Sequence, residues 1–332
     1  MTRSRAASPT VLTVGRSGVD LYPLESGVRL EDVTTFGRFL GGSPTNVAVA
    51  AARLGQSAAV LTGVGDDPFG RFVRAEMRRL GVSDAYVVTT PDLPTPLTFC
   101  EIFPPDDFPL YFYRRPGAPD LEITPDDVPA EAVRDAAVVW FSASGLSQEP
   151  SRSAHVAALA ARQRRTHTVL DLDYRPMFWP DRDEASAQVR AFLPGVTVAV
   201  GNTEECDVAV GERDADRAAD ALLEAGADVA VVKQGPRGTL AKTADERVVV
   251  PPLEVDVVNG LGAGDAFGGA LCHGLVEGWS LHRTVSAANA AGAIVAGRLE
   301  CSTAMPALAE LLAVLDDRVP PGVVERVPVA AR

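Results

Sequence analysis

The sequence predicts an α/β fold: a mostly parallel sheet with helices on both faces, and a small accessory sheet. Two observations carry this prediction. Short apolar runs alternate with segments of helical pattern along most of the 332 residues, which is typical of a parallel sheet covered on both sides. The stretch 96–115 breaks this alternation and has the pattern of a β-hairpin.

The first strand–turn–helix unit lies near the N-terminus. Val11 to Tyr22 is interpreted as a strand with a bend, and Val33 to Leu40 as another. Gly41-Gly42 then break the chain. Ser43 is predicted to be the N-cap of a helix that continues to Leu54, with a proline in its first turn.

The same pattern recurs further along the chain. Apolar runs predict buried strands at 58–62, 138–142, 168–172, 196–200, 229–233 and 253–258. Helical patterns lie between several of them, at 67–80, 151–164 and 217–223. Because strands alternate with helices, the strands are expected to run parallel in one sheet.

A separate small sheet is expected from the segments near 16–40 and 96–116. Residues 96–103 and 110–115 are rich in Thr, Phe, Tyr and Ile, and a turn rich in Pro and Asp joins them. This pattern predicts a hairpin, which with the early strands is suited to form a lid over a pocket.

The last third of the chain is predicted to be helical, at 264–276, 281–296 and 307–315. Residues 318–332 are rich in Pro and Val and are expected to be a flexible, poorly anchored tail. No internal repeat or linker divides the chain, so residues 1–332 are interpreted as a single domain.

Composition narrows the function. The formal net charge is −13, which argues against nucleic acid and anionic membranes as partners. No run approaches the ~20 apolar residues of a membrane span, and Val11–Val14 is too short for a signal-peptide core. The four cysteines form no CxxC pair, and the four histidines show no metal-ligand spacing. A cytoplasmic protein is expected.

The most informative segment is the glycine-rich turn at 259–269 (NGLGAGDAFGG), which precedes a predicted helix. Backbone N–H groups at a helix N-terminus favour an anion such as phosphate. The spacing fits neither the P-loop nor the dinucleotide-binding fingerprint. Asp265 is either a capping carboxylate or a base that accepts a proton from a hydroxyl while the amides hold the transferred phosphoryl group.

Gly262-Ala263-Gly264-Asp265 resembles the C-terminal signature of the PfkB, or ribokinase-like, sugar kinases. Residues 41–46 (GGSPTN) and 50–55 (AAARLG) resemble their N-terminal signature. The resemblance spans nearly the whole chain and implies a three-layer α/β/α domain with a β-sheet lid, acting on a sugar with ATP and Mg²⁺. It implies that Asp265 is the catalytic base and that the backbone of Gly262, Ala263 and Gly264 forms the anion hole.

One departure concerns a monovalent cation. The family usually has Asp-Thr just before this motif, in a region that helps to form a cation site in some members. Asn259-Gly260 occupy those places here. Activation by potassium is therefore not expected from the resemblance.

Candidate nucleotide contacts follow the strands of the second half. Asn202 and Glu205 match the family's N-x-x-E motif, which implies contact with ATP and, through water, with Mg²⁺; the alternative is an N-cap with a capping box. The turn from Lys233 through Gly235 to Gly238 matches a stretch beside the nucleotide, although on pattern alone it is a hairpin turn. The remaining ATP candidate, matched to a position near the adenine, is Asn289.

Candidate sugar contacts come from the early segments and the lid. By resemblance they are Asp20, Gly41, Gly42 and Asn46. Arg114 on the lid hairpin and Arg175 after a strand are suited to an oxidised, anionic sugar, because an Arg fork binds carboxylates bidentately. Asp171 and Asp173 are either paired carboxylates for acid–base work or structural residues.

Three segments point to one subgroup of the family. Residues 171–176 (DLDYRP), 301–306 (CSTAMP) and Tyr113-Arg114 are similar to 5-dehydro-2-deoxygluconokinases, which phosphorylate the 6-hydroxyl of 5-dehydro-2-deoxy-D-gluconate in inositol catabolism. A 2-keto-3-deoxygluconate kinase, then a fructokinase or ribokinase, are the alternatives. A catalytically inactive sugar or nucleotide sensor is the non-enzyme alternative. The resemblance also implies a homodimer formed through the lid sheet.

Overall fold

The structure, a computed structural model, describes residues 8–165, 167–317 and 322–326. Within this part, the larger sheet contains the strands β1 (Val11–Val14), β4 (Ala58–Gly65), β5 (Val82–Ser83), β6 (Val87–Thr90), β9 (Val138–Ser142), β10 (Thr168–Asp171), β11 (Val198–Asn202), β12 (Val229–Lys233), β13 (Thr239–Lys242), β14 (Glu246–Val250) and β15 (Val323–Arg326). The smaller sheet contains β2 (Gly18–Pro23), β3 (Phe36–Gly41), β7 (Leu97–Cys100) and β8 (Leu110–Tyr113).

The helices are α1 (Ser43–Arg53), α2 (Pro68–Arg79), α3 (Ala130–Asp135), α4 (Ser151–Arg162), α5 (Arg182–Phe192), α6 (Thr203–Val210), α7 (Ala215–Glu224), α8 (Ala263–Val276), α9 (Leu281–Ala296) and α10 (Leu308–Asp317). Short 3₁₀ turns join several elements. The predicted mostly parallel sheet with helices on both faces and a separate small sheet is confirmed. Within the described ranges, no helix combines the length and hydrophobicity needed to cross a bilayer.

The order of the strands indicates which edge of the large sheet is suited to bind a ligand. The large sheet runs β15-β14-β13-β12-β11-β10-β9-β1-β4-β5, with β6 also beside β4. Strands β12 through β5 are parallel, whereas β13, β14 and β15 pair antiparallel. The chain builds outward from β1 in one direction through β4 and in the other from β9 to β12. The carboxyl ends of β1 and β9 therefore flank a topological switch point, where open α/β sheets bind ligands.

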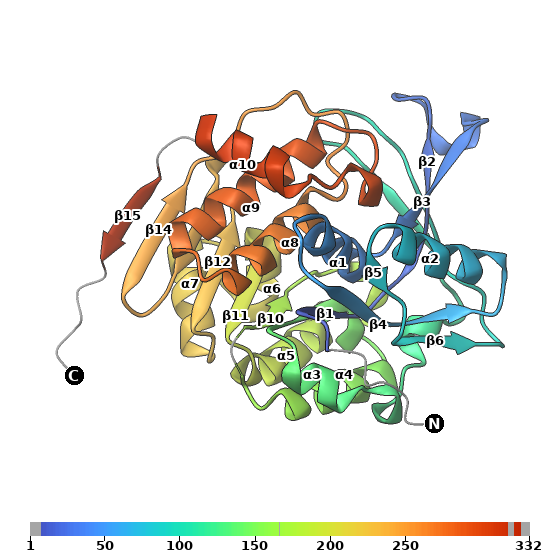
Figure 1. Cartoon of the computed structure of the whole chain (residues 1–332), viewed down its shortest axis with the longest axis horizontal. Helices are drawn as coiled ribbons and strands as arrows, with labels where there is room; N and C mark the ends of the chain where they lie inside the picture. Colours follow the sequence, from blue (N-terminus) through green and yellow to red (C-terminus); the bar gives the residue numbers. More distant parts are fainter. Residues whose placement is uncertain (1–7, 166, 318–321, 327–332) are drawn as a thin grey trace.

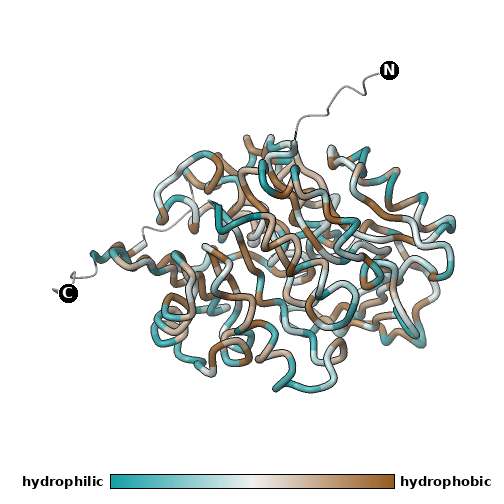
Figure 2. The backbone as a smooth tube through the Cα atoms, turned by 90° about the horizontal axis from the view of Figure 1, so that it is seen from below, coloured by the Kyte–Doolittle hydropathy of each residue, from teal (hydrophilic) through white to brown (hydrophobic). Residues whose placement is uncertain are grey.

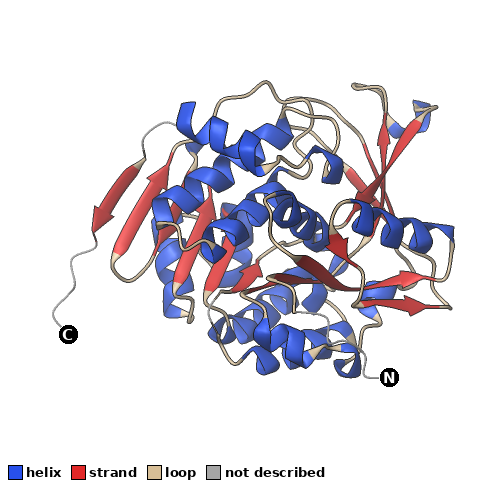
Figure 3. Ribbon diagram, viewed as in Figure 1, coloured by secondary structure: helices blue, strands red, loops and turns tan. Residues whose placement is uncertain are grey.

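Helices form a layer on each face of this sheet (Figures 1 and 3). One buried cluster lies between the sheet and α1, α2, α8, α9 and α10. A second lies between the opposite face and helices α3 to α7. Hydrophobic stretches run mainly through the interior in Figure 2, as expected for strands buried on both faces.

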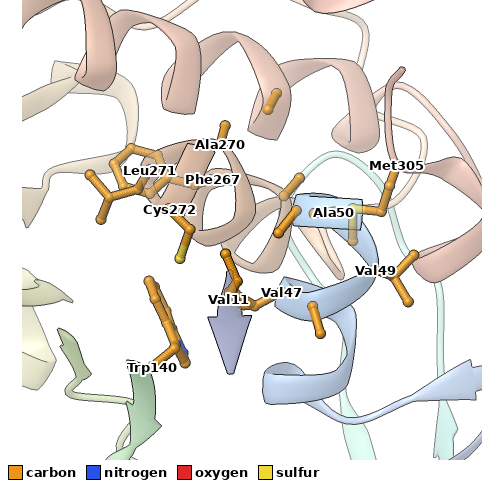
Figure 4. Packing of buried hydrophobic residues seen from close by; sticks show 14 of the residues in the cluster. Val11, Val47, Val49, Ala50, Trp140, Phe267, Ala270, Leu271, Cys272 and Met305 are labelled. Atoms are coloured by element: carbon orange, nitrogen blue, oxygen red, sulfur yellow. The ribbon is translucent and has the colours of Figure 1, made fainter. Parts of the chain in front are cut away.

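Helices α1 and α8 pack unusually closely. A Cβ atom added at Gly269 would lie 2.2 Å from the Cβ of Ala50, and one at Gly268 would lie 2.7 Å from the Trp140 ring. Figure 4 shows Val47 and Ala50 of α1 facing Phe267 and Ala270 of α8, with Trp140 beneath them. The glycine pair thus lets the two helices approach until their N-terminal ends meet at the site.

The smaller sheet, here called the lid, has the order β3-β2-β7-β8. Hairpin β7–β8 is antiparallel, as predicted, and β2 joins it to the early strands. Alternate residues of each strand point to opposite faces. Asp20, Tyr22, Leu110 and Phe112 line a cavity under the lid, whereas Tyr113 is 63% exposed.

Two local predictions were wrong, and a third concerns a segment that the structure describes only in part. Ser43 is not the N-cap of α1; Gly42 is, with φ +104°, and the Ser43 hydroxyl instead hydrogen-bonds Asp265. The run 253–258 forms no strand, because it leaves the sheet at Pro251-Pro252 and bonds the end of α9 through Val258. Part of the expected tail forms β15, which pairs β14; residues 318–321 and 327–332 lie outside the described part.

We predict that Gly269→Val destabilises the protein by about 1–3 kcal/mol, because new methyl groups overpack the α1–α8 contact. Urea denaturation measures this. Gly297→Ala is the matched control, since a Cβ there would meet its nearest atom at 3.6 Å, and it is expected to change the free energy of unfolding by about 0.5 kcal/mol or less. Equal losses in both variants would contradict close packing as the cause.

Candidate active site

A polar cavity of about 290 Å³ lies at the switch point, between the lid and the N-terminal ends of α1 and α8. The strand ends contribute Arg16 after β1, Ser144 after β9, and Asp173 and Arg175 after β10. The predicted residues Asp20, Gly42, Asn46, Gly262, Gly264 and Asp265 all line it. Elements distant in the sequence therefore meet at one edge of the sheet.

Asp265 lies in the first turn of α8 and faces this cavity. Its Oδ2 accepts a hydrogen bond of 2.8 Å from the Asn46 side-chain amide, and the Ser43 hydroxyl also donates to it. Burial raises the pKa of Asp265 to about 6, against these hydrogen bonds, which lower it. The carboxylate is ionised at neutral pH and can accept a proton.

The turn before α8 presents backbone amides to the same place. Gly262 is the N-cap, at φ +82°, and a side chain there would strike Cys301. Asn259, fully buried, donates to the Leu299 carbonyl and accepts from the Leu261 N–H. These bonds hold the turn. The Ala263 N–H donates to the Gly260 carbonyl over a long 3.5 Å, and the N–H groups of the first turn of α8 suit an anion.

Asp20 forms the lid-side wall. It is buried, and its Oδ2 accepts from the Tyr22 hydroxyl at 3.2 Å, while its Oδ1 has no partner in the described part of the chain. Burial raises its pKa. A Cβ at Gly41 would lie 2.0 Å from Oδ1. Gly41 therefore leaves room for the carboxyl, whose free oxygen suits a ligand hydroxyl.

The two arginines predicted to contact the sugar, Arg175 and Arg114, lie in different surroundings. Arg175 lines the cavity and its Nε lies 3.1 Å from Asp173 Oδ1. Arg114 does not line it: its guanidinium pairs with buried Asp120 at 2.9 Å and stacks on Phe178. Sequence analysis missed Arg16, which does line the cavity. Its place just after β1, at the carboxyl edge of a predicted parallel strand, was the available signal.

A second cavity of about 370 Å³ lies on the other side of the α8 N-terminus. The predicted residues Lys233, Gly235, Gly238 and Asn289 line it, and its walls are mostly apolar. Both cavities include Gly264 in their lining. The side-chain amide of Asn289 is engaged by Thr239 and by the carbonyls of 250 and 251, so it shapes the wall.

Asn202 and Glu205 form a capping box, which the sequence analysis gave as the alternative to contact with ATP and Mg²⁺. The Asn202 side chain accepts from the Glu205 N–H at 2.9 Å, and Glu205 accepts from the Asn202 N–H at 2.7 Å. Neither residue lines the polar cavity or the second cavity. Among the described residues, no group of three or more His, Cys, Asp and Glu side chains is placed to hold a metal ion.

Lys233 sits among carboxylates beside the shared wall. Burial lowers its pKa, but the surrounding carboxylates, led by Glu205, together outweigh burial, so the pKa is raised and the ammonium stays charged. Burial, together with the negative charge of Asp173, raises the pKa of Asp171. A Cβ at Gly264 would lie 3.7 Å from Lys233 Nζ. A cation therefore stands within reach of the α8 N-terminus, where it reinforces anion binding.

Two cavities meet at one helix end, with a carboxylate on one side and a lysine on the other, an arrangement that suits a reaction between two small molecules. The model of the pfkB family of carbohydrate kinases matches residues 8–308. The chain belongs to this family and is a carbohydrate kinase.

Named relatives agree with that assignment. A 5-dehydro-2-deoxygluconokinase of Shouchella clausii is 31% identical over 93% of this chain and 96% of its own length. One from Geobacillus kaustophilus is 33% identical, over 90% and 91%. A fructokinase of Xylella fastidiosa with bound ATP has the same fold, with a TM-score of 0.82 at 24% identity, covering 93% of this chain and 98% of that one.

We predict that Asp265→Asn stabilises the fold at pH 8 but not at pH 4. The folded protein raises the Asp265 pKa from 3.8 to about 6, so the stability linked to this proton is present below pH 4 and lost as pH rises through 6. After allowance for solvent screening, the gain at pH 8 is about 1–2 kcal/mol. Urea denaturation at both pH values measures it. A gain of equal size at pH 4 would contradict the pKa assignment.

Proposed function

We propose that the protein transfers the γ-phosphoryl group of ATP to a hydroxyl of a sugar acid, most specifically the 6-hydroxyl of 5-dehydro-2-deoxy-D-gluconate. The observation that carries this proposal is the position of Asp265. It faces the polar cavity while its neighbour Gly264 also lines the second one. An acceptor hydroxyl in the first cavity and a nucleotide in the second would thus meet at one helix end.

In this mechanism the Asp265 carboxylate accepts the proton of the acceptor hydroxyl as that oxygen forms a bond to the γ-phosphorus and the bond to ADP breaks. The Asn46 amide, 2.8 Å away, orients the carboxylate. Backbone N–H groups of the turn at Gly262, Ala263 and Gly264 stabilise charge on the travelling phosphoryl group. Positioning and electrostatic stabilisation supply most of the acceleration in such reactions.

For ATP we propose the second cavity, with Lys233 on the phosphates and the turn at Gly235 and Gly238 beside the nucleotide. Its apolar walls suit a purine ring. Mg²⁺ is usually held by one or two carboxylates plus substrate phosphates, and we propose that it comes to this site with the phosphates of ATP. When bound, Mg²⁺ would neutralise phosphate charge, with Glu205 as its nearest proposed contact through water. Asn202 stays a proposed nucleotide contact.

The sugar acid is supported by two independent features. Curated relatives at 31–33% identity carry the name 5-dehydro-2-deoxygluconokinase. The polar cavity is lined by two arginines, Arg16 and Arg175, and guanidinium groups are the preferred partners of carboxylates. Arg114 would take part only if it left Asp120, so we do not assign it to the substrate.

We further propose a homodimer that pairs the outer faces of two lids, in the cytoplasm. Tyr111 and Tyr113 are 40% and 63% exposed on that face, and aromatic residues are enriched at interfaces. All four cysteines are buried free thiols, as suits a reducing compartment.

The reaction is tested by ADP release with a panel of sugars. We expect the highest kcat/KM with 5-dehydro-2-deoxygluconate. A higher value with 2-keto-3-deoxygluconate, fructose or ribose would replace the substrate assignment. No turnover with any sugar, while ligands still bind, would favour a sensor.

We predict that Asp265→Asn lowers kcat by about 10²–10⁴-fold while ATP binding is kept, because the base contributes about that much. In the unmodified enzyme, kcat/KM should fall tenfold per pH unit below about pH 6, where Asp265 becomes protonated. Steady-state kinetics from pH 5 to 8 measure both. A flat profile, or near-normal turnover of the variant, would refute the role of Asp265.

We predict that Lys233→Met raises the KM for ATP about 10–100-fold, because a charge-assisted contact to phosphate is lost. Lys242→Met is the matched control: Lys242 lies on the adjacent strand β13 and pairs with Asp220. Its KM for ATP should stay within about twofold, since the pair contributes little. An equal rise in both variants would assign the effect to lost positive charge in general.

A further inference from the structure

The two arginines of the polar cavity are not equivalent. Arg175 is ion-paired with Asp173 through its Nε. Arg16, in contrast, has no ion-pair partner within 4.0 Å among the described residues. Its guanidinium is half-buried in the cavity wall, where an unpaired cation attracts an anionic ligand.

They also lie on different sides of the cavity. Arg16 donates to Thr98 of the lid, which stands opposite Asp20 in the sheet, whereas Arg175 pairs with Asp173, whose Oδ2 accepts from the Ser142 hydroxyl at the end of β9. Asp20 belongs to lid strand β2, and Asp265 to the first turn of α8. Arg175 therefore stands at the edge of the large sheet, and Arg16 on the lid side of the cavity.

The lid holds the Arg16 side chain in place. Its Nη1 donates to the Thr98 hydroxyl of β7 at 3.2 Å, and its guanidinium lies 5.2 Å from the centre of the Phe112 ring of β8. Thr98 is buried, and Phe112 lines the cavity. These two contacts restrict the Arg16 side chain, which reduces the entropy that binding would cost.

A substrate phosphorylated on its terminal hydroxyl places its carboxylate at the far end of the carbon chain. From this geometry we infer that Arg16 is the residue that recognises the carboxylate of the substrate, while Arg175 serves the end where phosphoryl transfer takes place. This inference rests on the proposed sugar-acid kinase activity. Arg16 then determines the specificity for an acid, and the lid residues that hold its side chain contribute to that specificity.

The test compares 5-dehydro-2-deoxygluconate with its C1 carboxamide, which has nearly the same shape but no charge. The unmodified enzyme should prefer the acid by at least 30-fold in kcat/KM, the scale of a hydrogen-bonded charge contact. Arg16→Met should raise the KM for the acid and bring the preference below about threefold. Arg175→Met should lower kcat on both compounds alike and keep the preference.

Arg115→Met is the matched control, because Arg115 is exposed and lies outside the polar cavity; it should leave the preference unchanged. Should Arg16→Met fail to fold, Arg16→Gln, which can still donate to Thr98, replaces it with the same expectation. A normal preference in a folded Arg16 variant would overturn the inference and leave the sugar-acid kinase intact. No preference in the unmodified enzyme would overturn both the acid substrate and the role of Arg16.

Discussion

Helices α1 and α8 approach each other closely because Gly268 and Gly269 carry no side chains to hold them apart. The rest of the site depends on this contact. It brings Asn46, at the start of α1, within 2.8 Å of Asp265, at the start of α8. Two segments more than two hundred residues apart thereby form one unit, and the amide fixes the direction of the carboxylate. The same contact aligns the glycine turn with the carboxyl edge of the sheet.

The charges gathered at this edge are unfavourable for folding and useful for chemistry. Burial raises the pKa of Asp20, Asp171 and Asp265, which means that each ionised group is less stable in the folded protein than in water. Arg175 offsets part of this cost for Asp265, and Lys233 does so for Asp171. A site that gathers carboxylates and cations before any ligand arrives needs little rearrangement to bind phosphates and a sugar, in line with electrostatic preorganisation.

Prediction from the sequence succeeded where a local pattern decides the structure. The alternation of strands and helices, the hairpin and the glycine turn at 259–269 depend on neighbouring residues. It did not decide which of several available partners a polar side chain takes. Arg114 pairs with Asp120, six residues away in sequence and across a loop, and so turns from the polar cavity. Asn202 and Glu205 fit two interpretations equally well, and the capping box is formed.

The sequence by itself determined the fold class, the lid hairpin and the place of Asp265 in a glycine-rich helix start, because hydrophobic periodicity and glycine placement act over a few residues. Only the tertiary structure decided which cations enter the polar cavity, that the two cavities share one wall, and that Arg16 rather than Arg114 lines the polar cavity. Those outcomes depend on which strand ends lie at the same edge of the sheet and on which buried carboxylate forms an ion pair with each guanidinium. Such competition is settled by packing across the whole chain.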